Sequence, residues 1–176
     1  VCCGTGDIAL KMADARHDLK VTGIDFSPAM LEVAESKRGR RQNVRFTQGN
    51  AMKLPYRDDS FTAACISFGL RNTADYEQVL REMRRVVRPG GYIYCLDSFV
   101  PDNPVVQPFY KIYFRYIMPR LGGGSKYRQE YMWLYESTQK FLHRGELEEL
   151  YRDIGLKAVD YKNRMCGACV LVWGRK

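Results

Sequence analysis

Short groups of residues in this sequence have the types and spacing needed to bind and transform a small molecule. Gly4-Thr5-Gly6 stands just before an amphipathic stretch. Glycines in such a loop let the backbone approach a ligand closely, and a helix N-terminus offers free N–H groups. The dinucleotide fingerprint G-x-G-x-x-G is not met, because Ala9 stands three positions after Gly6. The loop suits either a nucleotide pyrophosphate or a nucleoside with an amino-acid tail.

Further polar residues stand at the ends of predicted strands. Asp25 follows the loop by about 20 residues, where a carboxylate accepts both hydroxyls of a ribose. The alternative reading of Asp25 is a surface or helix-capping residue, although Ser27 is the better cap. Asn50-Ala51 follows the next strand, and an amide there can hydrogen-bond an adenine edge. Ser67 closes the strand after that. Because ligands of open α/β sheets bind outside the carboxyl ends of the strands, these residues should share one rim.

The elements that must position these residues alternate between strand and helix. Apolar periodicity, caps and breakers predict strands over 21–25, 44–47, 61–68 and 92–96, and helices over 7–15 and 75–87. A further helix is expected to begin at Pro28, after a Ser27 cap. The run 61–68 is continuously apolar, as a central parallel strand should be. This order predicts an α/β fold with a doubly wound, Rossmann-like, mostly parallel sheet.

The region 101–145 breaks that rhythm and reads as a helical insertion. It contains an aromatic stretch at 109–118 and a further helix-like stretch at 127–136. The aromatic side chains are either core or the wall of an apolar cleft. After the insertion we expect a helix over 146–153 and two strands, 158–163 and 169–174, close enough in sequence to pair as an antiparallel hairpin.

Length and composition favour one soluble domain. The chain has 176 residues, of which 45% are hydrophobic and 27% charged, and domains most often have roughly 100–150 residues. No apolar run approaches the roughly 20 residues of a membrane span, and no signal peptide is visible, so we expect a cytoplasmic protein. A glycine loop is normally preceded by a buried strand. We therefore expect a single domain, 1–176, that lacks its N-terminal segment.

The formal net charge of +8 allows a nucleic-acid partner, an anionic membrane surface or simply a solvated basic face. The densest cluster lies at 38–41. Cys166 and Cys169 form a CxxC without a second copy, which favours two small buried residues. His17 and His143 lack ligand spacing. We therefore expect no metal and no disulfide framework.

Taken in order, CCGTGD, GIDFSPAML, GNAMKLP, SFGLRN and RVVRPGG resemble the motifs of the C-methyltransferases of menaquinone and ubiquinone biosynthesis. The resemblance runs from Val1 to the C-terminus and includes the segment 130–137. Most of these motifs mark methyltransferases in general. SFGLRN and the aromatic insertion point to the quinone branch, and overall similarity favours the menaquinone type.

The resemblance implies a class I methyltransferase that uses S-adenosylmethionine and releases S-adenosylhomocysteine. It implies that Gly4, Thr5 and Gly6 hold the methionine part, that Asp25 holds the ribose, that Asn50 and Ala51 hold the adenine, and that Ser67 lines the cofactor pocket. The segment 68–72, with Phe68 and Gly69, would face the substrate.

Transfer of a methyl group to a ring carbon needs an electron-rich carbon, which a quinol supplies once a hydroxyl is deprotonated. A cation near that oxygen stabilises the charge, and Arg71 is placed for this. Since an arginine does not readily hold a proton, a water polarised by Arg71 and Asn72 is the expected proton acceptor. The alternative is that Arg71 pairs with Asp75 or Glu77.

A prenylated quinol also needs an apolar groove. The aromatic insertion could supply one through Phe109, Tyr110, Tyr113, Phe114 and Met118, and a basic surface could contact anionic lipid. A homodimer is left open. The alternatives are the ubiquinone branch, a nicotinamide-dependent oxidoreductase and a non-catalytic nucleotide-binding module. A nucleic-acid amino-methyltransferase, and with it a nucleic-acid partner, is disfavoured because segment 67–70 lacks the usual Pro-Pro-aromatic motif.

Overall fold

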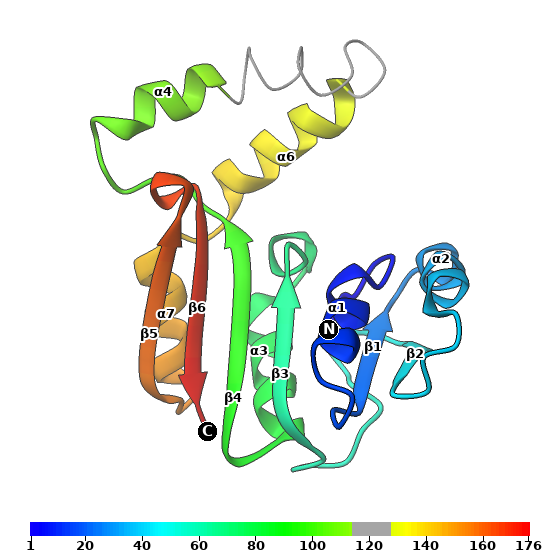
Figure 1. Cartoon of the computed structure of the whole chain (residues 1–176). Coiled ribbons are helices and arrows are strands. Elements are labelled where there is room, and N and C mark those ends of the chain that lie inside the picture. The colour runs from blue at the N-terminus through cyan, green and yellow to red at the C-terminus, as the bar shows by residue number, and fades with distance from the viewer. Residues whose placement is uncertain (114–127) are drawn as a thin grey trace.

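Strands and helices alternate along the first part of the chain, as the sequence predicts, and the last strands form a hairpin (Figure 1). The computed structural model describes residues 1–113 and 128–176. The strands are β1 (Val21–Asp25), β2 (Val44–Gln48), β3 (Phe61–Ser67), β4 (Val87–Ser98), β5 (Lys157–Arg164) and β6 (Cys169–Arg175). The helices are α1 (Asp7–Ala15), α2 (Pro28–Arg38), α3 (Tyr76–Val86), α4 (Val106–Ile112), α6 (Arg128–Lys140) and α7 (Arg144–Asp153), with 3-10 turns η1 (Leu70–Asn72) and η4 (Met165–Gly167).

The strands form a parallel pair, β1-β2, and a four-stranded sheet of order β3-β4-β6-β5. β3 and β4 are parallel, whereas β6 runs antiparallel to both β4 and β5. Among the described strands, β6 is therefore the one that opposes the common direction. The expected fold class, with its antiparallel C-terminal hairpin, is confirmed.

The segment 1–3 lies between the two sheets and bonds to both. The N-terminal nitrogen of Val1 donates to the carbonyl of Cys65 on β3 at 2.7 Å, and the amide of Cys3 donates to the carbonyl of Ile24 on β1 at 3.0 Å. The glycine loop thus leaves the middle of the strand layer, with β1 on one side and β3 on the other.

The predicted start of α2 at Pro28 is confirmed, α3 starts one residue after the predicted position 75, and α7 starts two residues before the predicted position 146. Ser27 caps α2 by accepting a hydrogen bond from Met30 N at 3.4 Å, with Pro28 in the first turn. Asp75 caps α3 by accepting from the amide of Gln78 at 2.9 Å. The helix ends at Val86 rather than Val87 because Val87 already pairs with Phe61 in the sheet.

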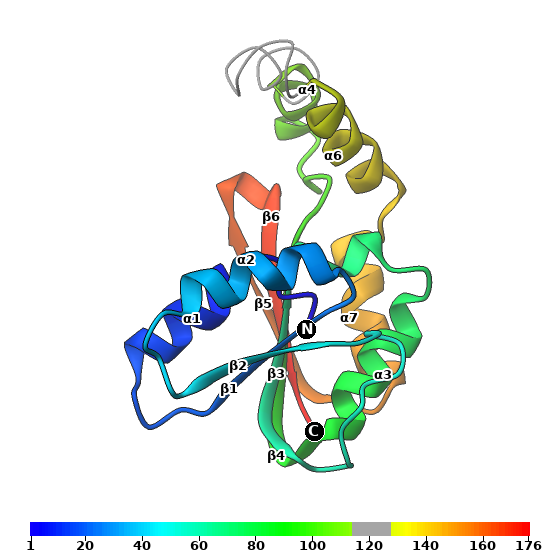
Figure 2. The ribbon, with the colours of Figure 1, turned by 90° about the vertical axis from the view of Figure 1, so that its right-hand side faces the viewer.

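Helices α3 and α7 pack on one face of the four-stranded sheet, while α1 lies on the other side of the strand layer (Figure 2). The largest core cluster joins the apolar side of α3 to α7 and to the central strands, and includes Leu80, Met83, Ile93, Leu147 and Tyr151. Each fully buried apolar side chain of this size contributes roughly 1.5–3 kcal/mol relative to exposure. This core holds the strand ends in a fixed relation to one another.

Helices α4 and α6 project beyond the end of the sheet (Figure 1). They leave several apolar side chains exposed, among them Val105 at 70%, Phe109 at 69% and Trp133 at 64%. Within the described ranges, no helix is long and apolar enough to cross a membrane.

Candidate functional site

The glycine loop turns sharply between the strand layer and α1. Gly4 has φ +52° and Gly6 has φ +79°, a left-handed conformation that favours glycine. A Cβ on Gly6 would lie 2.7 Å from the ring of Phe46, so Gly6 is required for packing. A Cβ on Gly4 would meet no protein atom within 4 Å. The space at Gly4 is therefore open to a ligand.

Asp25 joins this loop to the end of β1. Its Oδ2 accepts a hydrogen bond from Gly4 N at 2.7 Å, and its Oδ1 accepts from Ser27 N at 3.0 Å. Each carboxylate oxygen can accept a second bond. The side chain is partly exposed, so the fixed carboxylate can still receive two ligand hydroxyls. Ser27 also caps α2, which makes the capping alternative for Asp25 unnecessary.

Asn50 and Ala51 stand in the loop that follows β2. Asn50 Oδ1 accepts from the amide of Met52 at 2.9 Å, and the Asn50 carbonyl accepts from Lys53 N at 3.1 Å. This turn engages the side-chain oxygen and leaves the Nδ2 group as the donor that can reach a ligand.

β3 ends at Ser67, and Phe68 follows it directly. Ser67 Oγ is buried and has no hydrogen-bond partner within the described residues. Phe68 has φ +53°, which is unusual for a bulky residue, and its side chain is 42% exposed. Strained backbone of this kind tends to occur at functional sites, and an unpaired buried hydroxyl calls for a partner.

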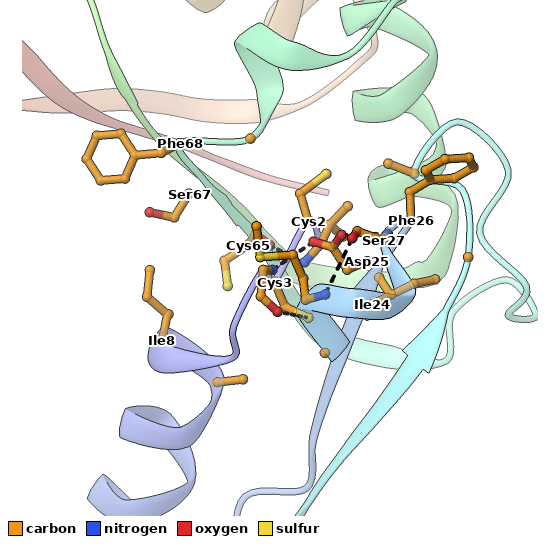
Figure 3. Close-up of a pocket in the computed structure, with 18 of the residues that line it drawn as sticks. Cys2, Cys3, Ile8, Ile24, Asp25, Phe26, Ser27, Cys65, Ser67 and Phe68 are labelled. Carbon is orange, nitrogen blue, oxygen red and sulfur yellow. Dashed lines mark hydrogen bonds between the residues drawn. The ribbon is translucent and has the colours of Figure 1, made fainter. Parts of the chain in front are cut away.

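These walls enclose a cavity of about 760 Å³ (Figure 3). Of the predicted cofactor-binding residues, the ones that line it are Gly4, Thr5, Asp25, Asn50, Ala51 and Ser67, and the predicted substrate residues Phe68 and Gly69 line it too. Gly6 lies behind the wall and supports it. The cavity has the volume of a pocket for a drug-sized ligand or cofactor.

The lining also includes apolar and thiol side chains that sequence patterns did not single out: Cys2, Cys3, Cys65, Ile8, Met12, Phe26 and Met30. Burial raises the pKa of Cys3 to about 11 and also raises that of Cys2, so these thiols stay neutral at neutral pH. The apolar residues one turn into α1 could have been found from the helical period, since Ile8 and Met12 share the face that follows the glycine loop.

Arg71 does not line the cavity. Its Nη1 pairs with Asp97 Oδ1, and the two side chains are 9% and 0% exposed. The alternative partners are engaged elsewhere, because Asp75 caps α3 and Glu77 pairs with Arg81. The guanidinium also lies 5.6 Å from the centre of the Phe68 ring, and its Nε is buried without a partner within the described ranges.

Asp97 ends β4 and accepts three hydrogen bonds. Besides the Arg71 side chain, Ser98 N donates to it at 2.8 Å and the amide of Arg71 donates at 3.4 Å. Burial raises the pKa of Asp97, and the neighbouring cation opposes that rise. Asn72, by contrast, lines the cavity, and its Nδ2 donates to the Phe68 carbonyl at 3.3 Å.

The predicted groove residues separate into different environments. Tyr110 is 5% exposed and packs in a small apolar cluster with Tyr135 of α6, and burial raises its pKa to about 12. Phe109 and Tyr113 are exposed at 69% and 37%. Phe114 and Met118 lie outside the described residues. Tyr110 therefore connects α4 to α6, while Phe109 and Tyr113 expose apolar surface beside it.

The cysteine interpretation was partly wrong. Cys166 is exposed and lies in η4 at φ +56°, and Cys169 is partly buried on β6. The turn that links β5 to β6 holds Cys166 outside the sheet, which a continuous β-like run did not indicate. Across the described part of the chain, no group of three His, Cys, Asp or Glu side chains could hold a metal ion.

The basic cluster at 38–41 is partly neutralised. Arg41 pairs with Asp14 at 2.6 Å and Arg38 pairs with Glu35 at 2.7 Å. Exposed pairs of this kind contribute about 0.2–1 kcal/mol each. This face therefore resembles an ordinary solvated surface more than a binding patch.

The comparison with known proteins identifies the family. A sequence profile of the ubiE/COQ5 methyltransferase family matches residues 1–176. The chain belongs to this family. Demethylmenaquinone methyltransferases of Alkalihalophilus pseudofirmus and Shouchella clausii are 43% and 44% identical to it, over the whole chain and over 76% and 77% of their own lengths.

The fold is likewise that of class I methyltransferases. A crystal structure of an S-adenosylmethionine-dependent methyltransferase of Thermotoga maritima superposes with a TM-score of 0.70 at 21% identity, over 99% of this chain and 79% of its own. Family and fold together make this chain an S-adenosylmethionine-dependent methyltransferase. The site fits that cofactor, since Gly4 leaves open space where a bulkier residue would intrude, and Ser67 offers an unpaired hydroxyl.

A Gly4→Ala substitution should weaken binding of S-adenosylhomocysteine, because its methyl group enters the open space. The left-handed backbone should also cost about 1–2 kcal/mol of stability. Gly39→Ala is the matched control, since Gly39 has φ +58° and lies outside the cavity. Calorimetric titration and urea unfolding of both variants measure the two effects. Equal binding by Gly4→Ala and wild type would contradict the assignment of this space to the ligand.

An Asp97→Ala substitution should destabilise the fold by about 3–5 kcal/mol, because Arg71 would remain buried without a counter-ion. Asp18→Ala removes an exposed partner of Arg16 and should cost no more than about 1 kcal/mol. Urea unfolding at neutral pH measures both. A loss for Asp97→Ala as small as that of the control would show that the buried pair contributes little.

Proposed function

We propose that this methyltransferase transfers a methyl group to a ring carbon of a prenylated quinol, converting demethylmenaquinol to menaquinol. The observation that carries the proposal is the identity of 43–44%, over the whole chain, with relatives named demethylmenaquinone methyltransferase. The cavity supports it, because an exposed aromatic residue, Phe68, stands on the wall formed by β3.

In this proposal the chain holds the methyl donor along the strand ends. The glycine loop, with Gly4 and Thr5, holds the methionine part, and Gly6 supports the loop from behind. Asp25 accepts the ribose hydroxyls through the lone pairs that Gly4 and Ser27 leave free. Asn50 Nδ2 and the Ala51 backbone contact the adenine, and Ser67 Oγ finds its missing partner on the ligand. When bound, S-adenosylmethionine supplies an electrophilic methyl group on a sulfonium.

The residues after β3 act on the quinol. Phe68 and Gly69 form the surface against which the ring lies, and Asn72 faces the same cavity. Asn72 can orient a water that accepts the hydroxyl proton. Because Asp97 offsets much of its charge, Arg71 acts here more by fixing Phe68 and Asn72 than by stabilising the anion as a free cation.

The helical insertion is the proposed site of the isoprenoid tail. Tyr113 and the exposed Phe109 present apolar surface on α4, and Tyr110 fixes α4 against α6. Phe114, outside the described residues, belongs to the same proposal by its place in the sequence. A tail seated here would emerge at the end of the molecule that lies beyond the sheet (Figure 1).

Transfer of labelled methyl from S-adenosylmethionine by the full-length protein tests the reaction and the branch. The acceptors are reduced demethylmenaquinone and the reduced demethyl precursor of ubiquinone, each with a short tail. We expect label in the naphthoquinol. Label in the benzoquinol alone would move the protein to the ubiquinone branch. Turnover of a nicotinamide cofactor, with no label in either acceptor, would favour an oxidoreductase.

We further propose that the α4–α6 end contacts an anionic membrane surface, where a prenylated substrate resides. Exposed apolar side chains gather there, and the chain carries a net charge of +8. Apolar side chains at the interface and basic residues near it add to one another in binding anionic lipid. A homodimer is compatible with this arrangement, and sedimentation would measure it.

Cosedimentation with vesicles tests membrane contact. Wild type should sediment with vesicles that contain phosphatidylglycerol more than with pure phosphatidylcholine, because anionic lipid attracts the basic chain. Phe109→Ser/Trp133→Ser should lose most of this binding. Leu19→Ser is the control, since Leu19 is 37% exposed and lies after α1. Retained binding by the double variant would exclude the α4–α6 end as the contact.

A further inference from the structure

The loop between β2 and β3 carries one wall of the cofactor cavity without a helix or a paired strand of its own. It contains Asn50 and Ala51, which line the cavity, and continues through Leu54 and Tyr56 to Ser60 before β3 begins. The buried polar groups of such a segment must find partners elsewhere. The partners that this loop uses therefore decide how firmly the cavity wall is held.

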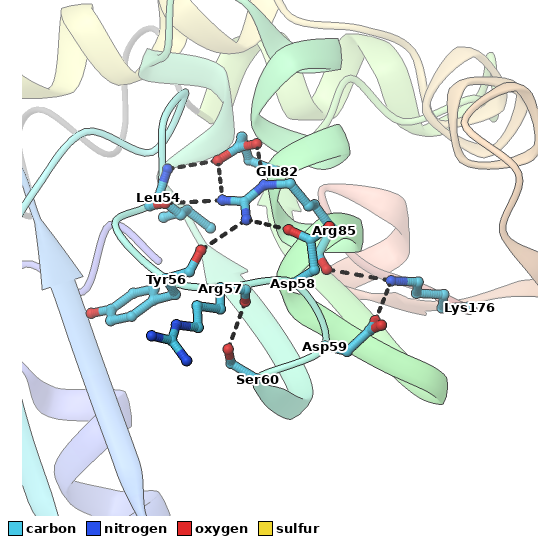
Figure 4. Close-up of polar contacts among 9 residues, drawn as sticks. All are labelled: Leu54, Tyr56, Arg57, Asp58, Asp59, Ser60, Glu82, Arg85 and Lys176. Carbon is cyan, nitrogen blue, oxygen red and sulfur yellow. Dashed lines mark hydrogen bonds and ion pairs between the residues drawn. The ribbon is translucent and has the colours of Figure 1, made fainter.

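Arg85 of α3 supplies several of these partners (Figure 4). Its Nη2 donates to the Leu54 carbonyl at 3.0 Å and its Nη1 to the Tyr56 carbonyl at 2.8 Å. The same Nη1 donates to Asp58 Oδ1 at 2.8 Å. The planar guanidinium thus contacts alternate residues of the loop, a geometry that a lysine ammonium cannot reproduce.

Glu82, one turn before Arg85 on α3, also bonds to the loop. Its Oε2 accepts from the amide of Leu54 at 2.8 Å, and both of its oxygens pair with Arg85, at 2.7 and 2.8 Å. The hydrogen bonds from Arg85 lower the pKa of Glu82, so it is ionised at neutral pH. Both backbone groups of Leu54 are therefore held by this charged pair, and the Leu54 side chain is buried at 4% exposure.

Gln78, one further turn toward the start of α3, extends the contact to the cavity. Its Nε2 donates to the carbonyl of Met52 at 3.0 Å, while Met52 N donates to Asn50 Oδ1 at 2.9 Å. Gln78, Glu82 and Arg85 share one face of α3, at helical spacing. Gln78 thus holds Met52, whose amide bonds to the side chain of Asn50, while Arg85 and Glu82 hold Leu54 two residues further along the same loop.

We infer that Arg85 and Glu82 are positioning residues that set the affinity for S-adenosylmethionine by fixing the loop that carries Asn50 and Ala51. The inference rests on the proposed binding role of Asn50 and Ala51. Neither Arg85 nor Glu82 lines the cavity, so their effect passes through the loop. Loss of the pair should let the loop sample other conformations, and the ligand would then have to order it on binding.

The neighbouring arginine on α3 provides a matched comparison. Arg81 pairs with Glu77 of the same helix, and both side chains are about half exposed, at 52% and 51%. It has the same charge and an ion pair of the same kind, yet it does not bond to the loop. Both arginines lie in the helix predicted over 75–87, and nothing in the sequence distinguishes one from the other.

The experiment compares Arg85→Met with Arg81→Met in the full-length protein. Titration calorimetry gives the Kd for S-adenosylhomocysteine, and amide hydrogen exchange reports on residues 50–58 without any need for turnover. We expect Arg85→Met to raise Kd by about tenfold, since a hydrogen bond to a charged group is worth about that factor or more. Exchange should quicken in 50–58 and stay unchanged in α1. Arg81→Met should alter neither.

Two further variants separate positioning from general destabilisation. Glu82→Gln keeps the shape of the side chain and should raise Kd by a smaller factor, and Arg85→Lys should restore binding only in part. Faster exchange in 50–58 with Kd unchanged would overturn the inference, as would equal weakening by Arg81→Met. Failure of wild type to bind S-adenosylhomocysteine would instead refute the proposed cofactor site itself.

Discussion

A single carboxylate, that of Asp97, fixes the side of the cavity formed by the residues that follow β3. It lies near the end of β4 and has no exposed surface. It accepts hydrogen bonds from both the side chain and the backbone amide of Arg71. A buried charge persists only with a partner of this kind. The turn after β3 is therefore tied to β4, and the left-handed backbone of Phe68 is held in place although it is strained. The position of the cavity wall that contains Phe68 follows from this pair.

The cavity walls are held by different means on each side. Asp25 bonds the glycine loop to the end of β1 through Gly4, so that wall depends on one carboxylate and one amide. The loop that carries Asn50 depends on side chains of α3, because it has no strand partner. Parallel strands bring these elements to one rim, and the core beneath α3 and α7 keeps the rim rigid. The two walls of the cavity therefore share one framework but are held by separate contacts.

Sequence patterns predicted the elements whose signals are local. The helix at 7–15, the cap at Ser27 and the hairpin of β5 and β6 follow from periodicity, capping and spacing, and all three are confirmed. The rule that ligands of open α/β sheets bind outside the carboxyl ends of the strands predicted that the polar candidates would lie together, and they line one cavity. The partner of Arg71 was missed, because Asp97 is 26 residues away and only the pairing of β3 with β4 brings them together.

Contacts between residues far apart in the sequence, or local turns, also explain the other residues whose positions the sequence did not predict. Arg85 looked like any surface arginine, since its loop contacts lie some 30 residues back along the chain. Cys166 looked buried because its segment is apolar, yet a 3-10 turn lifts it out of the sheet. The thiols of Cys2 and Cys65 reach the cavity through the order of strands rather than through any motif.

The position of β6 between β4 and β5 has a consequence for biosynthesis. On a ribosome, β4 emerges long before its partner, since Ser98 pairs with Cys169 and the whole stretch 99–168 must first be translated. During that interval the edge of β4 exposes unpaired N–H and C=O groups beside apolar side chains, a surface on which nascent chains associate with one another. Slow translation through α4–α7 would lengthen that exposure, and chaperone binding would shorten it. The antiparallel strand thus leaves one edge of β4 without its partner until almost the whole described chain has been synthesised.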